Sequence, residues 1–143
     1  MHWYIIALVV GFCVALQPTV NAALRNEVGV APVLILGSVL VLIGSIVVGL
    51  LWPEQARWDK LGSVRPDLWL GAIYGLTIIL GGMLAVPKLG AAPALGLILV
   101  GQLSFGLLID HFGLYGVPRT PISASRVLGV LAVLGGFLLI RRG

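Results

Sequence analysis

The chain has 143 residues, of which 59% are hydrophobic and 10% are charged, and its mean hydropathy is +1.13. A soluble domain of this length leaves too much surface exposed to hide so many apolar side chains, so the composition excludes a soluble globular protein and indicates an integral membrane protein. The net charge of +4 does not indicate nucleic-acid binding, because the charged residues lie between apolar segments, where they act as topology and headgroup signals.

The first apolar segment, residues 5–24, is long enough to cross a bilayer as a helix. A cleavable secretory signal is the alternative, because Val20-Asn21-Ala22 resembles a small-residue cleavage site, but no Lys or Arg precedes the segment. Its cysteine, Cys13, is the only one in the chain, which excludes an intrachain disulfide and a cysteine-based metal cluster. We therefore expect a first transmembrane helix here.

Two amides and a proline stand together in the second half of this segment. Gln17 and Asn21 are four residues apart and share one face of a helix, while Pro18 removes the hydrogen bond that the carbonyl of Val14 would otherwise accept. We expect a kink at Pro18 and a local polar pocket, which is how membrane helices often form substrate or ion sites. The alternative is a packing kink whose amides bond neighbouring helices.

Two further apolar segments, 31–52 and 68–86, also have the length of transmembrane helices. The polar stretch between them, residues 53–67, is too short for a second domain and has the length of a surface loop. Residues 87–90, Pro-Lys-Leu-Gly, are expected to form a tight turn that ends the third helix.

Small residues recur four apart in both of these segments. Ser45 and Gly49 form such a pair in the second segment, and Gly71 and Gly75 form one in the third. This spacing is typical of faces where transmembrane helices pack closely. Tyr74, next to the second of these faces, is the one aromatic residue that we assign to a substrate pathway.

The fourth apolar segment, residues 93–109, carries a polar stripe. Gln102, Gly106 and Asp110 are each four residues apart, so on one helix they place an amide deep in the membrane and a carboxylate at its edge. A buried amide needs partners that hydrocarbon does not offer, so the stripe should face other helices or a wet cavity, with Ser104 nearby. The alternative is that Gln102 joins helices and Asp110 ends the helix.

The last apolar segment, residues 124–140, brings the expected architecture to five transmembrane helices in a single domain, residues 1–143. An odd number of spans puts the two termini on opposite sides of the membrane. The side of the N-terminus then holds five of the nine Lys and Arg residues, and the other side holds four. Orientation depends on a bias in this count, so we expect dual topology, with two oppositely inserted copies pairing antiparallel. The alternative is one orientation, fixed by the aromatic residues near the N-terminal side or by a partner.

Several short motifs follow one another along the whole chain: Gln17-Pro18-x-x-Asn21, Pro87-x-x-Gly90, Gly101-Gln102, Asp110-His111-Phe112-Gly113-Leu114-Tyr115-Gly116-Val117-Pro118-Arg119, and Arg126 with Gly129. Together they resemble the YdcZ-like five-helix branch of the drug/metabolite transporter superfamily. The second segment departs from that pattern, because Ser38-Val39-Leu40-Val41-Leu42 stands where Ser-Phe-x-x-Gly is expected. The resemblance implies a bacterial multi-pass protein of the inner membrane, in which two five-helix units form an inverted-repeat assembly of ten helices. It also implies that a solute passes between the units.

A transporter of this kind places its site where the two repeats meet. The groups available for a substrate pathway are Gln17, Asn21, Tyr74, Gln102 and Ser104. None of the apolar segments contains Asp, Glu, Lys or Arg, so we expect a small neutral or amphipathic solute rather than proton-coupled export of a cation. Asp110 and His111 at the membrane edge are candidates for gating or coupling, because a histidine there changes charge between pH 5 and 8.

Other functions remain open on the sequence alone. A scaffold, or a partner subunit of a heteromeric complex, would use the same glycines and amides only for assembly, and the antiparallel partner could be a second copy or a related subunit. An enzyme is not expected, because His2 and His111 lie at opposite ends of the chain and no catalytic or metal-ligand spacing is present. We expect no cofactor and no metal, and membrane lipid and a small solute as ligands.

Overall fold

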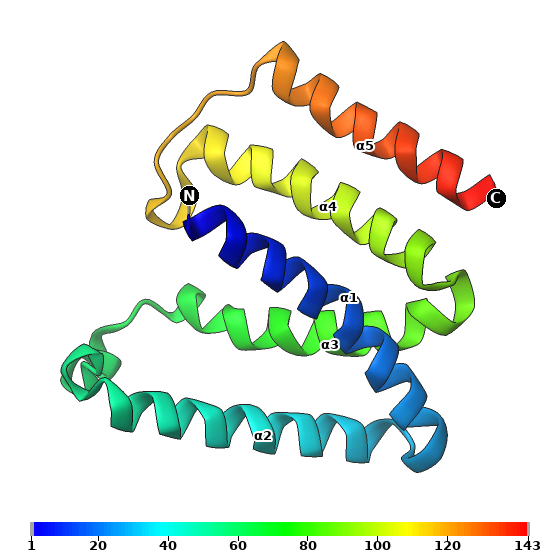
Figure 1. The fold of residues 1–143 in the computed structure, drawn as a ribbon. Coiled ribbons are helices and arrows are strands. Elements are labelled where there is room, and N and C mark those ends of the chain that lie inside the picture. The colour runs from blue at the N-terminus through cyan, green and yellow to red at the C-terminus, as the bar shows by residue number, and fades with distance from the viewer. Residues whose placement is uncertain (1, 143) are drawn as a thin grey trace. The chain divides into compact units, whose positions relative to one another are not determined.

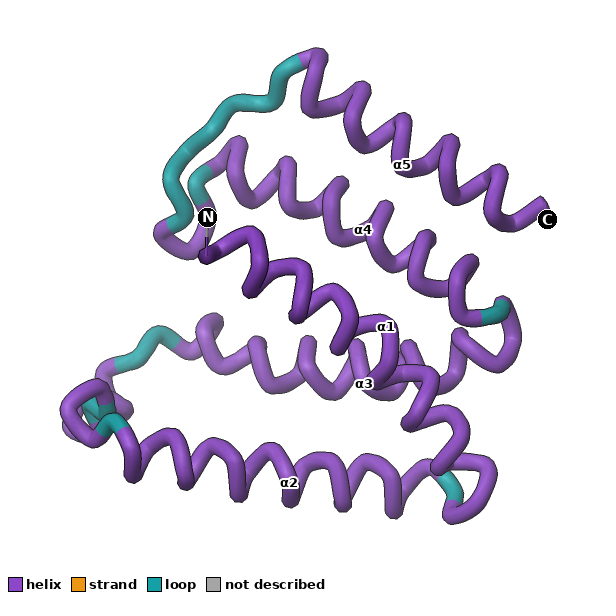
Figure 2. The backbone as a smooth tube through the Cα atoms, viewed as in Figure 1, coloured by secondary structure: helices purple, strands orange, loops and turns teal. Residues whose placement is uncertain are grey.

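The computed structural model describes residues 2–142, apart from the side chain of Gln55, and over that range the chain is helical and has no strands. Its long helices are α1 (His2–Val28), α2 (Val30–Leu51), α3 (Leu70–Leu89), α4 (Ala91–Phe112) and α5 (Ala124–Arg142). Short 3-10 helices fill the connections: η1 (Pro53–Gln55), η2 (Trp58–Ser63), η3 (Pro66–Trp69) and η4 (Leu114–Gly116). Figure 2 shows loop segments between each pair of consecutive long helices, including the short junctions that have no 3-10 helix. Within residues 2–142, five helices are long and apolar enough to cross a membrane, which confirms the expected fold class.

Two helices, α1 and α4, extend at both ends beyond the apolar segments from which they were predicted. α1 continues four residues past Leu24 to Val28, because a helix does not end where the lipid-facing apolar side chains end. α4 begins at Ala91 and not at Pro93, since a proline is tolerated in a first turn whose N–H groups have no helical partner. The tight turn expected at 87–90 is wrong: α3 runs through Pro87 to Leu89, and only Gly90 separates it from α4.

The described residues fall into two compact units, one up to Leu84 and the other from Ala85 onward. The prediction of a single domain over 1–143 stays a prediction, and residues 1 and 143 lie outside the described residues. In the first unit, Ala22 of α1, Val33 of α2 and Met83 of α3 form a small buried cluster. Where α1 meets α3, a methyl group on Gly82 would come within 2.8 Å of Pro18 Cβ, so this helix contact requires glycine.

In the second unit α4 and α5 lie side by side and antiparallel (Figure 1). Phe137 of α5 is buried, and its ring lies 3.2 Å from the position that a methyl group on Gly96 would take. Ala94, in the first turns of α4, is also buried. A glycine on one helix and an aromatic ring on the other therefore set the distance between these two helices.

The junctions between α1 and α2 and between α3 and α4 share one local structure. Gly29 has φ 84° and ψ 175°, and Gly90 has φ 85° and ψ 155°, a backbone region that is essentially closed to other residues. Each glycine opens the same sequence pattern, Gly-x-Ala-Pro-x-Leu, at 29–34 and at 90–95. The N–H of Gly29 donates to Arg25 O at 2.8 Å, and that of Gly90 donates to Val86 O at 2.9 Å. One glycine is thus enough to reverse the chain at both places.

Candidate functional site

Hydroxyl groups inside the apolar helices are largely satisfied by their own helix. Each of four hydroxyls donates to the carbonyl four residues earlier, at 2.7–3.1 Å: Thr19, Ser45, Thr77 and Ser104. This bond lets a hydroxyl face lipid without an unmet donor. Ser104, which the sequence assigns to the pathway, therefore has a partner without any ligand.

The side-chain amides in the same helices lack such partners. Gln17 of α1 and Gln102 of α4 are exposed, and Asn21 of α1 is half-buried. Among residues 2–142, none of the three amides forms a hydrogen bond. An amide has two N–H donors and one carbonyl acceptor. Moving an amide into an apolar environment that satisfies none of these groups costs about 2–7 kcal/mol. These three residues are therefore the groups in the membrane helices that most need an external partner.

Pro18 lies between the two amides of α1 and is buried against α3. α1 runs unbroken through it, and the missing N–H of Pro18 leaves the carbonyl of Val14 without its helical donor. Gln17 and Asn21 therefore stand on α1 next to the contact with Gly82. The carbonyl of Val14 and the two unpaired amides therefore place polar groups within the apolar stretch of α1.

The predicted pathway residues are divided between the two units. Gln17, Asn21 and an exposed Tyr74 belong to the first, and Gln102 and Ser104 belong to the second. The stripe of Gln102, Gly106 and Asp110 does lie on one helix, α4, as expected. That all five residues meet at one site stays a prediction.

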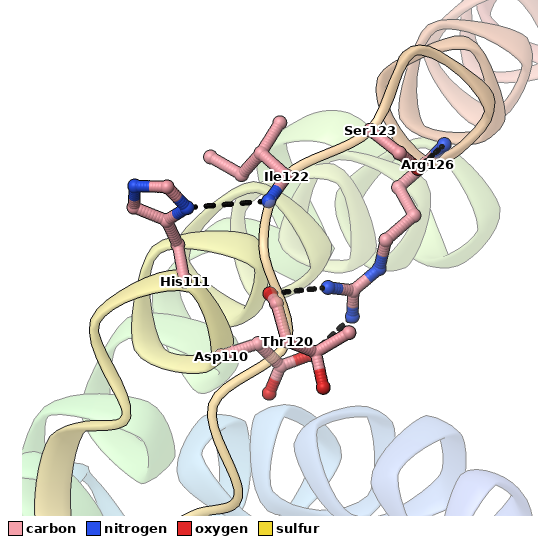
Figure 3. A network of polar contacts seen from close by, with 6 residues as sticks. All are labelled: Asp110, His111, Thr120, Ile122, Ser123 and Arg126. Carbon is pink, nitrogen blue, oxygen red and sulfur yellow. Dashed lines mark hydrogen bonds and ion pairs between the residues drawn. The ribbon is translucent and has the colours of Figure 1, made fainter.

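The polar groups predicted for gating lie where α4 ends, in a network that we call the α4–α5 clasp (Figure 3). The clasp consists of Asp110 and His111 of α4, Arg119, Thr120 and Ile122 of the connection, and Arg126 of α5. Its backbone part starts from the last turn of α4, where Asp110 O accepts the N–H of Thr120 at 2.8 Å and that of Gly113 at 3.3 Å. These bonds satisfy carbonyl groups that a helix end leaves open.

An ion pair joins the two helices of the clasp. The guanidinium of Arg126 donates from one nitrogen to a carboxylate oxygen of Asp110, and from another to Thr120 O at 3.1 Å. Both charged side chains are 30% exposed, so the pair is neither fully buried nor open on the surface. Asp110 is therefore a bonded carboxylate that ties α5 to α4.

His111 is bonded on both its backbone and its side chain. Its carbonyl accepts from Arg119 Nε at 3.0 Å, and its ring nitrogen Nδ1 accepts the backbone N–H of Ile122 at 3.2 Å. An acceptor at Nδ1 places the proton of a neutral imidazole on Nε2. The half-buried ring also meets Phe112 edge to face, with centroids 4.8 Å apart.

The sequence assigns no site role to Arg119, Thr120, Ile122 or Arg126. A signal for Arg126 does exist, because it lies in the first turn of α5, where the helix dipole disfavours a positive charge. Such an arginine needs an acidic partner, and Asp110 is the acidic residue just before this connection. Within the described part of the chain, no three His, Cys, Asp or Glu side chains gather as a metal site would require.

Comparison with known proteins gives two matches. The model of the family described as "Putative inner membrane exporter, YdcZ" matches residues 2–139. Over 98 residues the chain is 26% identical to the "Inner membrane protein YdcZ" of Escherichia coli (strain K12), and this alignment covers 66% of the chain. It also covers 66% of that relative, so the chain matches just under two thirds of the relative's length. No solved structure matches.

Proposed function

Because the chain belongs to the YdcZ family of the drug/metabolite transporter superfamily, we propose that it transports a small neutral or amphipathic solute by alternating access. The family and the five apolar helices place it in the inner membrane as a multi-pass protein, and the family is one of transporters and not of enzymes. The observation that carries the proposal is the set of unpaired amides, Gln17, Asn21 and Gln102, in helices whose hydroxyls are largely self-satisfied. Amides bind a polar, uncharged group and leave no net charge in the path.

The charge distribution supports an uncharged solute. The stretches of the five helices that cross the hydrocarbon carry no Asp, Glu, Lys or Arg, and Asp110 lies in the last turn of α4, bonded to Arg126. A membrane carboxylate that exchanges a proton for a cation must be free to bind both in turn. A bonded Asp110 does not meet this requirement, so the proposal assigns it and His111 to the gate and not to cation binding.

The proposal includes an antiparallel pair of chains, formed by two copies or by this chain and a related subunit. Small-residue faces support it: a methyl group on Gly49, Gly71 or Gly75 would have no atom of the described residues within 4 Å, apart from its own stretch of helix. These faces, which the sequence assigns to close packing, are open within one chain. A second chain that covers them would also offer partners to the exposed amides of Gln17 and Gln102.

The test is solute uptake by the purified chain in liposomes. Radiolabelled neutral and amphipathic metabolites, with tetraphenylphosphonium as a lipophilic cation, are compared with protein-free liposomes. We expect uptake of at least one uncharged solute, and we expect that uptake to fall about tenfold in Gln17→Leu and in Gln102→Leu. Each substitution removes a hydrogen-bonding group that contacts the solute, and such a bond is worth about 1.4 kcal/mol. Ser45→Ala is the matched control, because its hydroxyl bonds only its own helix.

Two results would contradict the proposal in different ways. If no solute enters, the chain acts as a scaffold or needs a different subunit, and addition of a related five-helix chain distinguishes these. If uptake of an organic cation depends on a proton gradient and survives Asp110→Asn with Glu27→Gln, the chain transports but the account of its uncharged path is wrong.

A further inference from the structure

We propose that His111 is a pH-sensitive latch: as neutral imidazole it holds the segment 121–123 on the end of α4, and on protonation it releases that segment. The proposal goes beyond transport, because it concerns how proton binding changes the connection between α4 and α5 within one chain.

The latch follows from the direction of one hydrogen bond. Ile122 offers its backbone N–H, so His111 Nδ1 must offer a lone pair at 3.2 Å. A protonated imidazole has N–H on both nitrogens and no lone pair in the ring plane. Two N–H groups then face each other across the contact, and the bond cannot persist. Figure 3 shows the second ring nitrogen turned away from Ile122, so the proton is gained at the atom that holds the segment.

The other bonds of the clasp do not depend on the charge of the imidazole. Thr120 N–H donates to Asp110 O, Arg126 pairs with the Asp110 carboxylate, and Arg119 Nε donates to the carbonyl of His111. Protonation of His111 therefore leaves residues 119 and 120 attached and frees the residues that follow. The release is local, and the chain does not need to unfold for it.

Three charged groups set the electrostatic environment of the latch. Asp110 of α4 is the neighbouring residue, Arg119 of the connection donates to the His111 carbonyl, and Arg126 of α5 pairs with the Asp110 carboxylate. Asp110 and Arg126 largely neutralise each other as a pair. Histidine is the side-chain type whose charge ordinarily changes between about pH 5 and 8, so the test compares the two ends of that range.

The released segment leads directly into α5. Ser123 Oγ accepts the N–H of Arg126 at 3.4 Å and so caps the first turn of that helix. Loss of the bond at Ile122 takes away the attachment one residue before this cap. Protonation of His111 is therefore expected to loosen the start of α5 relative to the end of α4.

The test uses the full chain in nanodiscs with His2→Gln, which leaves His111 as the single histidine. Nitrogen-15 NMR at about pH 8 reports the tautomer, and we expect an unprotonated Nδ1 and a proton on Nε2. Hydrogen exchange of the Ile122 amide is then measured at about pH 8 and pH 5 and expressed as a protection factor. We expect a fall of about fivefold to tenfold at the lower pH, the worth of one net hydrogen bond. The Thr120 amide is the internal control and should keep its protection, because its acceptor does not titrate.

Two variants separate the bond from the titration. His111→Asn keeps an acceptor oxygen near the position of Nδ1 without a titratable group, so Ile122 should be protected at both pH values. His111→Phe removes the acceptor, so Ile122 should be unprotected at both. A proton on Nδ1 at pH 8, or a protection factor of Ile122 in the His2→Gln chain that is the same at both pH values, would overturn the proposal. None of these readouts depends on transport, so their failure is distinct from a failure of the uptake experiment.

Discussion

A single arginine, Arg126, bonds two chain segments at once in the α4–α5 clasp. Its guanidinium spans the Asp110 carboxylate and the carbonyl of Thr120, which only a planar group with several donors does well. A lysine ammonium also has several N–H donors, but they sit on one nitrogen and cannot place two separate nitrogens on two acceptors as the planar guanidinium does. The clasp thus depends on the shape of this side chain as well as on its charge.

We predict that Asp110→Asn and Arg126→Gln each lower the free energy of unfolding by about 1–2 kcal/mol, as expected for a charged pair between surface and core. The double variant should cost clearly less than the two single effects added, because either substitution alone already breaks the pair. Thermal unfolding of the purified chain in detergent measures all three.

Arg65 and Asp67 provide the control, since this pair is local and its arginine side chain is 75% exposed. Asp67→Asn should change stability much less than Asp110→Asn, because this pair is exposed to solvent. Strictly additive effects at Asp110 and Arg126 would show that the ion pair does not hold the clasp together.

At the scale of single residues, the sequence indicates which residues form a site more reliably than it indicates which contacts those residues make. The motif from Asp110 to Arg119 points to the end of α4, and the structure has a polar network there. Its bonds could not be predicted, because they depend on how eleven residues between the helices fold back on α4. Left-handed backbone at Gly113 and Tyr115 turns the connection back toward α4. The spacing of residues in the sequence does not reveal this backbone conformation.

At the scale of helices, length and hydropathy were enough to predict all five spans, because a bilayer requires about 20 apolar residues in each. Contacts between helices were not predictable in the same way. The spaced pairs of small residues indicated packing faces, yet a methyl group on Gly71 or Gly75 would have no described atom within 4 Å beyond its own stretch of helix. The close contacts are at Gly82 and Gly96, whose partners Pro18 and Phe137 come from distant helices.

The contact of α1 with α3 yields a prediction from two adjacent glycines. Gly82→Ala places a methyl group 2.8 Å from Pro18 Cβ, and we expect a loss of about 1–3 kcal/mol in stability from overpacking. Gly81→Ala meets no atom within 4 Å and should be neutral or stabilising, because alanine favours a helix by about 1 kcal/mol over glycine.

Thermal unfolding of the two variants in detergent checks this prediction directly. Solute uptake adds a second readout, because a shift of α1 at Pro18 would also move Gln17 and Asn21. Equal stability of the Gly81→Ala and Gly82→Ala chains would mean that α1 and α3 do not touch at this point.

For the whole molecule, the balance of charge between the two expected sides of the membrane bears on the proposed antiparallel pair. If all five candidate helices span the membrane, the termini lie on opposite sides, and the nine Lys and Arg residues divide as five on the side of the N-terminus and four on the other. The orientation rule needs a clear excess on one side, which this chain lacks. An antiparallel homodimer requires this balance, because one sequence must insert both ways.

We predict that reporter fusions after the last residue give a signal from both a cytoplasm-active and an exterior-active reporter. Arg141→Ala with Arg142→Ala leaves five cationic residues against two and should fix the C-terminus outside. Replacing Arg57, Lys60 and Arg65 with serine leaves two against four and should fix it inside.

Mixing the two fixed chains gives the decisive comparison with each chain alone. If the functional unit is an antiparallel pair, each fixed chain should lose solute uptake by itself, and coexpression of the two should restore it, because only the mixture supplies both orientations. A natural chain that signals from one reporter alone would contradict the homodimer and direct the search to a related subunit of opposite orientation. Uptake by a single fixed chain would contradict antiparallel pairing altogether, because the transporting unit would then need one orientation only.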